Sequence, residues 1–268
     1  MTSPEALHDL ARSVAHAAAE FVRSRRPEGR VDVAATKSSD TDVVTEIDRA
    51  TEDLIRTMIA AARPGDAVMG EEGGFGGAEE SSDVTWIVDP IDGTVNFVHG
   101  LPGYSVSIAA SVGGVVEAGC VVDVVSGEEF AALRGNGATR TGPDGTTTAL
   151  GPPPQVRLEY ALIGTGFNYR PEIRAKQGAA VARLLGSVAD IRRIGSAAID
   201  LCNVASGRLD GYVEEGLKPW DLAAGRLIAE ESGAVVTGLD GEPNERMTIA
   251  CTPSIAAELL EEVRKAGF

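Results

Sequence analysis

From residue 160 onward, short apolar runs alternate with longer segments of helical period, and this alternation limits the chain to a layered architecture. The apolar runs predict strands over 160–164, 190–194, 210–214, 235–239 and 247–251. The segments between and after them predict helices over 174–185, 196–206, 221–232 and 252–267. Strands interleaved with helices in this way are typical of α/β and α+β folds.

The first part of the chain begins with two amphipathic helices and continues as strands. One helix is expected over 3–26, and a second from Thr45 to the Pro64-Gly65 pair. Strands are expected over 67–70, 85–89, 104–112 and 115–124, with a hairpin at Gly113-Gly114. Residues 141–154 are rich in Gly, Thr and Pro, so we expect the chain to divide into two halves there, 1–148 and 149–268.

Composition narrows the classes of function. The 268 residues are 43% hydrophobic, which is enough to bury a full core. The 40 acidic and 24 basic residues give a net charge of -16, which repels nucleic acid and anionic lipid, so neither is an expected partner. No stretch has membrane-spanning length and the N-terminus lacks an apolar signal core, so we expect a cytoplasmic protein. The three dispersed cysteines lack zinc-site spacing and are expected to be buried thiols.

The stretch WIVDPIDGTVNFVHGLP at 86–102 carries the most chemical information. An apolar strand runs directly into a compact turn, which can aim the carboxylates of Asp89 and Asp92 at one point with the Ile91 carbonyl between them. Carboxylate and carbonyl oxygens are the ligands that Mg²⁺ prefers. The amides of Gly93 and Thr94 would then face a phosphate. The alternative is an ordinary Asp-Pro…Asp-Gly turn without a ligand.

Three further acidic residues stand at the ends of predicted elements. Glu71 follows a short apolar strand and precedes the glycine-rich run 73–77, so it could be a ligand beside a mobile loop. Asp48 opens the second helix, and Asp221 opens a helix in the second half. A solvated acidic turn is the alternative for Glu71, and helix capping is the alternative for Asp48 and Asp221.

These segments occur in order along the chain, and together they resemble the inositol monophosphatase family of the lithium-sensitive, magnesium-dependent phosphatase superfamily. The matching strings are DVVTEIDRATE (42–52), GEE (70–72), WIVDPIDGTVNFVHGLP (86–102), TGF (165–167) and RRIGSAAIDLCNVASGRLDGYVEEGLKPWDLAAG (192–225). One string could arise by chance, whereas the ordered set is specific. The resemblance implies an α+β fold, a layered α-β-α-β-α sandwich of the sugar-phosphatase type, with the active site between the two halves.

The resemblance also implies roles for individual residues. Glu71, Asp89 and the Ile91 carbonyl would hold one Mg²⁺, and Asp89, Asp92 and Asp221 would hold a second, with a third, weaker ion near Glu71. Thr94 and Asp48 would orient and deprotonate the attacking water, with Glu71 as a further catalytic group. The substrate would be contacted by Asp92, Gly93, Thr94, Ser196, Ala197, Glu214 and Asp221, with the amides of Gly93 and Thr94 on the phosphate.

The substrate that the resemblance implies is a small phosphorylated polyol, foremost inositol-1-phosphate. The segment 211–214 resembles the inositol-type pocket, in which a carboxylate such as Glu214 pairs with vicinal hydroxyls and disfavours a second phosphate. Histidinol phosphate, fructose bisphosphate and nucleotide 3′-phosphates are the alternatives within the superfamily. The Gly73-Gly74 pair departs from the family, which usually carries a small hydroxyl residue after Glu72. Homodimerisation and inhibition by lithium are expected on the resemblance alone.

Two other classes of function compete with this interpretation. The Asp89…Asp92-Gly93-Thr94 string is superficially similar to the haloacid-dehalogenase phosphatases, but their two aspartates are separated by one residue near the start of the chain, and here two residues intervene. A degenerate family member that serves as a regulatory or assembly partner is the non-enzymatic alternative, and the intact candidate ligands argue against it.

Overall fold

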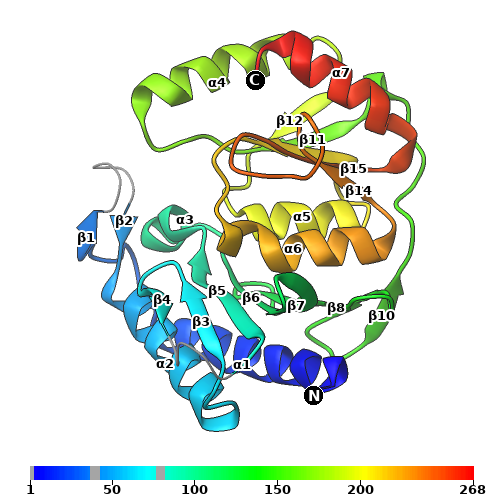
Figure 1. The fold of residues 1–268 in the computed structure, drawn as a ribbon. Coiled ribbons are helices and arrows are strands. Elements are labelled where there is room, and N and C mark those ends of the chain that lie inside the picture. The colour runs from blue at the N-terminus through cyan, green and yellow to red at the C-terminus, as the bar shows by residue number, and fades with distance from the viewer. Residues whose placement is uncertain (1–2, 37–42, 77–81) are drawn as a thin grey trace.

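The computed structural model describes residues 3–36, 43–76 and 82–268. Within these ranges the helices and sheets stack as five alternating layers (Figure 1). Helices α1 (Pro4–Arg25) and α2 (Glu46–Ala62) cover the outer face of a large sheet. Helices α5 (Ala197–Ala205) and α6 (Pro219–Ser232) lie between that sheet and a smaller one, and α4 (Pro171–Leu184) and α7 (Ala256–Ala266) close the other side. The expected α-β-α-β-α sandwich is confirmed.

Among the described residues, eight strands form the large sheet in the order β10-β9-β8-β7-β6-β5-β3-β4. Their bounds are β3 Ala67–Gly70, β4 Gly74–Gly76, β5 Val84–Asp92, β6 Ser105–Val112, β7 Val115–Asp123, β8 Glu129–Leu133, β9 Ala138–Thr141 and β10 Thr147–Leu150. The strands pair antiparallel except β3 and β5, which are parallel. A separate antiparallel pair is formed by β1 (Ala35–Thr36) and β2 (Val43–Val44).

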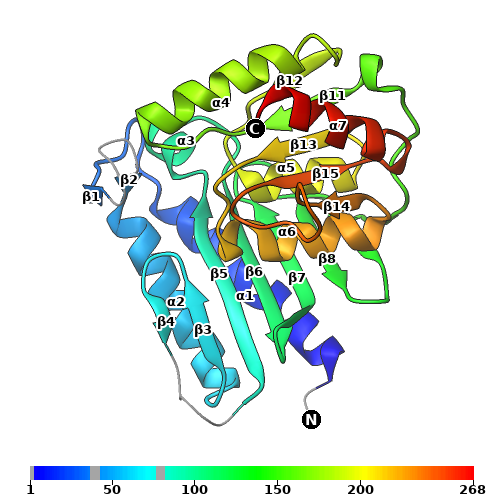
Figure 2. The same ribbon diagram turned by 45° about the horizontal axis from the view of Figure 1, so that its top comes forward.

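The small sheet has the order β12-β11-β13-β15-β14 (Figure 2). Its strands are β11 Leu162–Thr165, β12 Asp190–Arg192, β13 Gly211–Glu214, β14 Val235–Thr237 and β15 Thr248–Cys251. Short 3₁₀ turns at Leu158–Tyr160 and Pro253–Ile255 precede β11 and α7. The elements expected after residue 160 are therefore all present, with ends shifted by a few residues.

Local sequence explains where the helices begin. The Ser3 hydroxyl accepts a hydrogen bond from the Ala6 amide (3.2 Å), and Pro4 occupies the first turn of α1, where no amide donor is needed. Thr45 and Asp48 form a reciprocal capping box at the start of α2. The apolar face of α1 then packs on β6 and β7 in the core of the N-terminal half.

The strand β5 runs further than expected. The predicted tight turn at Asp89–Asp92 is instead the end of this strand, and a register shift against β6 lies between those two residues. The turn comes one residue later, at Gly93, whose φ of 98° is strained for other residue types. The six-residue helix α3 (Thr94–His99) follows at once. The bulge therefore fixes the direction of both aspartates more firmly than a surface turn would.

Five short strands were not foreseen: β1, β4, β8, β9 and β10. The glycine- and proline-rich stretch 141–154 contains β10, which pairs with β9 at the edge of the large sheet. The boundary expected at 148/149 thus falls within a strand, and the link to the small sheet begins after Leu150. One apolar cluster contains residues of the large sheet and of α5 and α6, so the two halves share part of their core. Their division into separate units remains a prediction.

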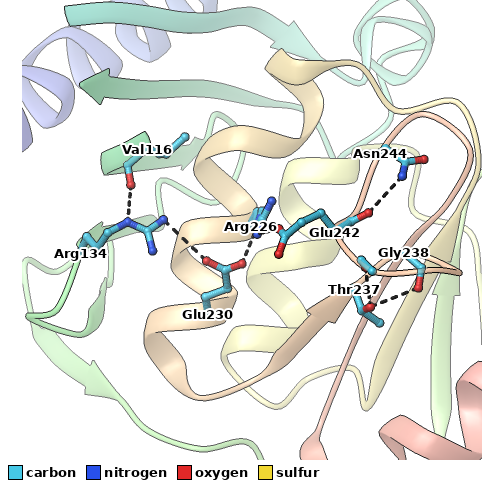
Figure 3. A network of polar contacts seen from close by, with 9 residues as sticks. Val116, Arg134, Arg226, Glu230, Thr237, Gly238, Glu242 and Asn244 are labelled. Atoms are coloured by element: carbon cyan, nitrogen blue, oxygen red, sulfur yellow. Dashed lines mark hydrogen bonds and ion pairs between the residues drawn. The ribbon is translucent and has the colours of Figure 1, made fainter. Parts of the chain in front are cut away.

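Helix α6 is tied by its side chains to elements on both sides of it (Figure 3). The Arg134 guanidinium donates to the Val116 carbonyl (2.7 Å) and lies 3.7 Å from the Glu230 carboxylate. The Arg226 guanidinium binds Glu230 (2.6 Å) and also Glu242 in the β14–β15 loop. These contacts link β7 and the residue after β8 to α6, and link α6 to the β14–β15 loop, so they hold the helix that carries Asp221.

Two further expectations concern the cysteines and the presence of membrane-spanning helices. All three cysteines are buried free thiols, as predicted. Among the helices formed by residues 3–36, 43–76 and 82–268, none combines the length and hydropathy that crossing a bilayer requires.

Candidate active site

A cleft of about 320 Å³ opens where the large sheet meets α6 and the small sheet. The end of β5 lies beside the start of α6 here, in both ribbon views (Figures 1 and 2). Nine of the predicted site residues line the cleft: Glu71, Asp89, Ile91, Asp92, Gly93, Thr94, Ala197, Glu214 and Asp221. The volume is within the range of small-molecule sites.

Three carboxylates meet at the centre of the cleft. One oxygen from each of Asp89, Asp92 and Asp221 lies within 4.8 Å of the others. Asp89 is 1% exposed and Asp92 is 9% exposed, so water screens their charges poorly. Buried like charges at this spacing repel each other unless protons or a cation neutralise them. The oxygen-only donor set is the one that hard divalent cations prefer, so the residues fit a Mg²⁺ site.

Backbone contacts fix the direction of Asp89. Its Oδ1 accepts a hydrogen bond from the Ile91 amide (3.0 Å), across the bulge in β5. The Ile91 carbonyl oxygen in turn lies 3.0 Å from the Thr94 hydroxyl. These contacts bring a carboxylate, a carbonyl and a hydroxyl into one small volume.

Asp92 is held from the second half of the chain. Its Oδ2 accepts from the Ser196 hydroxyl (2.6 Å) and the Ala198 amide (2.8 Å) at the start of α5. Burial raises the pKa of Asp92, and the hydrogen bonds from Ser196 and Ala198 oppose that rise. Asp92 therefore joins the two parts of the site, with one side on α5 and the other on the acidic cluster.

Asp221 does two things at once. Its Oδ2 accepts from the Lys218 amide (2.7 Å), which caps α6. The same side chain belongs to the acidic cluster, so capping and ligation are compatible here rather than alternatives. Burial, together with the negative charges of Asp92 and Glu71, raises the pKa of Asp221 well above its usual range.

Asp48 lies behind the cleft wall and reaches it through Thr94. It is fully buried, and its Oδ2 accepts from the amide (2.9 Å) and the hydroxyl of Thr45. Its Oδ1 accepts from the Thr94 hydroxyl (3.1 Å). Capping thus orients Asp48 so that its second oxygen faces Thr94, which itself borders the cleft.

The other end of the cleft is built from β13. The Glu214 carboxylate accepts a hydrogen bond from the hydroxyl of Tyr212, which is completely buried. Burial raises the pKa of Glu214 to about 7, although the Tyr212 hydrogen bond opposes that rise. A Cβ on Gly166 would overlap the Glu214 carboxyl group, so only glycine leaves room for it. Glu214 is therefore held firmly in the wall.

Ser196 is buried and contacts other residues of the protein. It is 1% exposed and is not among the residues that line the cleft. Its hydroxyl binds Asp92, lies 3.2 Å from the Ser105 hydroxyl and caps α5 through the Ile199 amide. The Ser196 side chain therefore supports Asp92, and its contact with the polyol stays a prediction.

Several residues of the cleft were not singled out from the sequence. They are Phe167, Asn168, Tyr169, Arg193, Glu215, Gly216, Leu217, Lys218 and Trp220. Most belong to the strings that carried the family resemblance or directly adjoin them, so position beside a motif was the available signal. The residue types alone gave no signal of a binding site, because an arginine or tyrosine in a loop is usually a surface residue.

Comparisons with known proteins find a matching family model and similar sequences. The family model described as "Inositol monophosphatase family" matches residues 3–267. The chain is 46% identical over 277 residues to the "Inositol-1-monophosphatase SuhB" of Mycobacterium tuberculosis, covering 98% of this chain and 94% of that protein. It is 43% identical over 217 residues to the "Nus factor SuhB" of Pseudomonas aeruginosa, covering 79% and 78%.

A solved structure gives the same result for the fold. The structure named "Mycobacterium tuberculosis SuhB" superposes with a TM-score of 0.85 at 44% identity, over 100% of this chain and 99% of that one.

Proposed function

Because the chain belongs to the inositol monophosphatase family, we propose that it hydrolyses the phosphate monoester of a small polyol, foremost inositol-1-phosphate, with two or three Mg²⁺ ions in each site. The observation that carries the proposal is the meeting of Asp89, Asp92 and Asp221 within 4.8 Å beside Thr94 in the cleft.

The ligand assignments follow from which oxygens border the cleft. Glu71, Asp89 and the Ile91 carbonyl are proposed to hold one ion, and Asp89, Asp92 and Asp221 a second, with a third, weaker ion near Glu71. Bound Mg²⁺ ions would neutralise the phosphate, lower the pKa of a coordinated water and stabilise the leaving alkoxide. The raised pKa of Asp221 supports this assignment, because the negative charges of Asp92 and Glu71 add to the effect of burial.

Proton transfer is assigned to the pair Thr94 and Asp48, with Glu71 as a further catalytic group. The Thr94 hydroxyl has one proton, which it donates toward the Asp48 carboxylate. Its lone pairs are then oriented to accept a hydrogen bond from a water in the cleft. Deprotonation of that water by the pair places the hydroxide beside the phosphate, and a proton relay of this kind is worth about 10²–10⁴ in rate.

The substrate's two ends are assigned to two walls. The phosphate is proposed to lie against the amides of Gly93 and Thr94, where the chain turns into α3, with Asp92 meeting the substrate through the Mg²⁺ that it would hold. The polyol is proposed to contact Ala197, Glu214 and Asp221. A carboxylate at Glu214 favours neutral vicinal hydroxyls and repels a second phosphate, which favours inositol-1-phosphate over a bisphosphate.

The test is phosphate release from a matched panel. Metal-stripped protein would be assayed with and without Mg²⁺ on inositol-1-phosphate, histidinol phosphate, fructose-1,6-bisphosphate and a nucleotide 3′-phosphate. We expect Mg²⁺-dependent release, fastest from inositol-1-phosphate, with inhibition by lithium. Faster release from histidinol phosphate would reassign the substrate, and equal release after full chelation would contradict the metal mechanism.

A non-catalytic role is kept as the second candidate, because a relative with 43% identity bears the name Nus factor. A protein that binds Mg²⁺ but releases phosphate from no member of the panel would support a regulatory or assembly role. We also propose a homodimer, and light scattering of the purified protein at two concentrations would give its mass directly.

A further inference from the structure

The turn that carries Glu71 is fastened to helix α2. Residues 71–73 join β3 to β4, and Gly70 pairs with Gly74 across the hairpin. Figure 2 shows this hairpin lying against α2, the helix whose first turn contains Asp48. The position of Glu71 therefore depends on how the hairpin contacts that helix.

One buried carboxylate makes the contact. Glu52 lies one turn after Asp48 on α2 and is 2% exposed. Its Oε2 accepts from the Glu72 amide (2.7 Å), and its Oε1 accepts from the Gly73 amide (2.8 Å). Two successive backbone amides thus bind one carboxyl group, which is the geometry of a backbone anion site filled by the protein's own side chain.

Arg56 completes the attachment one turn later. Its Nε donates to Glu52 Oε1 (2.8 Å) and keeps the buried carboxylate compensated. Its Nη2 donates to the Gly74 carbonyl (2.6 Å), and its Nη1 donates to the Val68 carbonyl (3.2 Å). The pair therefore binds backbone groups of β3, of the turn and of β4.

The glycines of the turn are explained by the same contact. A Cβ on Gly70 would overlap the Glu52 carboxyl group, and a Cβ on Gly73 would lie 2.7 Å from Glu52 Oε1. Real Cβ atoms avoid such distances, so a side chain at either position would push the carboxylate away. The glycine at 73, where the family resemblance leads one to expect a small hydroxyl residue, thus lets the backbone close directly on Glu52.

We propose that Glu52, with Arg56, is the positioning residue that holds Glu71 in its metal-binding place before the cation arrives. This inference rests on the proposed function of Glu71 as a ligand. One helix would then set the positions of two groups of the site, Asp48 directly and Glu71 through the Glu52–Arg56 pair. Preorganisation of this kind raises cation affinity because the turn loses less freedom on binding.

The experiment compares Glu52→Gln with Asp53→Asn, an exposed carboxylate on the next residue of α2, as the matched control. The glutamine keeps the shape of Glu52 but turns an NH₂ group toward one of the two amides. Hydrogen–deuterium exchange of the metal-free proteins would report the peptide spanning 70–76, and calorimetric titration with Mn²⁺ would report affinity.

In Glu52→Gln we expect at least about tenfold faster exchange of the Glu72 and Gly73 amides and about fivefold weaker Mn²⁺ binding, from loss of a charge-assisted pair of hydrogen bonds. The substrate KM at saturating Mg²⁺ should change less than about twofold, because Glu52 does not border the cleft. Asp53→Asn should match the wild type throughout.

Exchange and Mn²⁺ affinity in Glu52→Gln equal to those of the control would overturn the proposal. If Glu52→Gln does not fold, Arg56→Lys keeps the positive charge and removes the forked contacts to Val68 and Gly74, with the same two readouts expected to move. A wild-type protein that binds no Mn²⁺ would overturn the proposed function itself, and the exchange result distinguishes the two failures.

Discussion

The Thr94 hydroxyl lies 3.1 Å from Oδ1 of Asp48, although 46 residues separate the two in sequence. Neither side chain is more than 6% exposed. A hydroxyl held this way between a buried carboxylate and an open cleft is positioned to pass on a proton.

Removal of the Thr94 hydroxyl should therefore slow the chemical step. Thr94→Ala is expected to lower kcat by about 10²–10⁴, the usual contribution of a positioned proton acceptor. Thr94→Ser keeps the hydroxyl and should retain most of the activity. Equal rates of the two variants in steady-state phosphate release would remove this pair from the mechanism.

Asp92→Asn tests the shared ligand. The asparagine oxygen can still accept from Ser196 or Ala198, but it lacks the charge needed to share a cation, so kcat should fall by at least about 10³. The melting temperature of the metal-free protein should hold or rise, because one of several crowded carboxylates is neutralised. An active variant would refute the ligand assignment. A variant that does not fold would indicate that the role of Asp92 is structural.

The titration of Glu129 should contribute to the pH dependence of the free energy of unfolding. This buried carboxylate on β8 accepts from Arg12 (3.0 Å) and His16 (2.6 Å) on α1. Burial opposes its ionisation, yet the hydrogen bonds from His16 and Arg12 lower the pKa of Glu129 to about 2, from a usual value of 4.5.

A depressed carboxyl pKa stabilises the folded state above the unfolded pKa and loses that stabilisation as pH falls through the folded pKa. The Glu129 contribution, on the order of 3 kcal/mol, should thus be present above about pH 4.5 and disappear toward pH 2. In Glu129→Gln, the free energy of unfolding measured with urea should depend less on pH in that window. A pH dependence identical to that of the wild type would show that other carboxylates control the stability there.

Tyr212→Phe tests how Glu214 is held. The change keeps the buried ring and removes the hydroxyl that donates to Glu214. We expect the KM for the substrate to rise about threefold to tenfold, because Glu214 is held less firmly and its hydrogen bond to the polyol hydroxyls is weakened. The kcat should stay nearly constant, since that hydrogen bond is weakened equally in the ground state and the transition state. A loss in kcat with constant KM would place Glu214 at the reacting phosphate instead.

Much of the fold was predictable because glycine and proline residues mark the ends of helices in the second half of the chain. Gly233 ends α6 in the left-handed conformation, and Pro219 occupies its first turn. The strands β9 and β10 were missed because they form an exposed edge hairpin whose turn, at Gly142–Gly145, lies in a stretch with the composition of a linker. Tertiary pairing rather than local pattern makes those residues strands.

For the site, the sequence identified the acidic residues but not their supports. Asp89, Asp92 and Asp221 stand in turn-like or cap-like contexts, and only the packing of α6 against β5 brings them together. The supporting contacts also join distant parts of the chain, such as Ser196 to Asp92 across 104 residues. No local pattern encodes a contact of that kind, which is why the contact of Ser196 with Asp92 was not foreseen and Glu52 was not considered.

The most direct test of the central claim is an anomalous difference map from crystals of this protein soaked in Mn²⁺, which substitutes for Mg²⁺ at oxygen sites. We predict a strong peak bonded to Asp89, Asp92 and Asp221, and a second near Glu71 and the Ile91 carbonyl. A map with Mn²⁺ at other sites and none among these three aspartates would contradict the account.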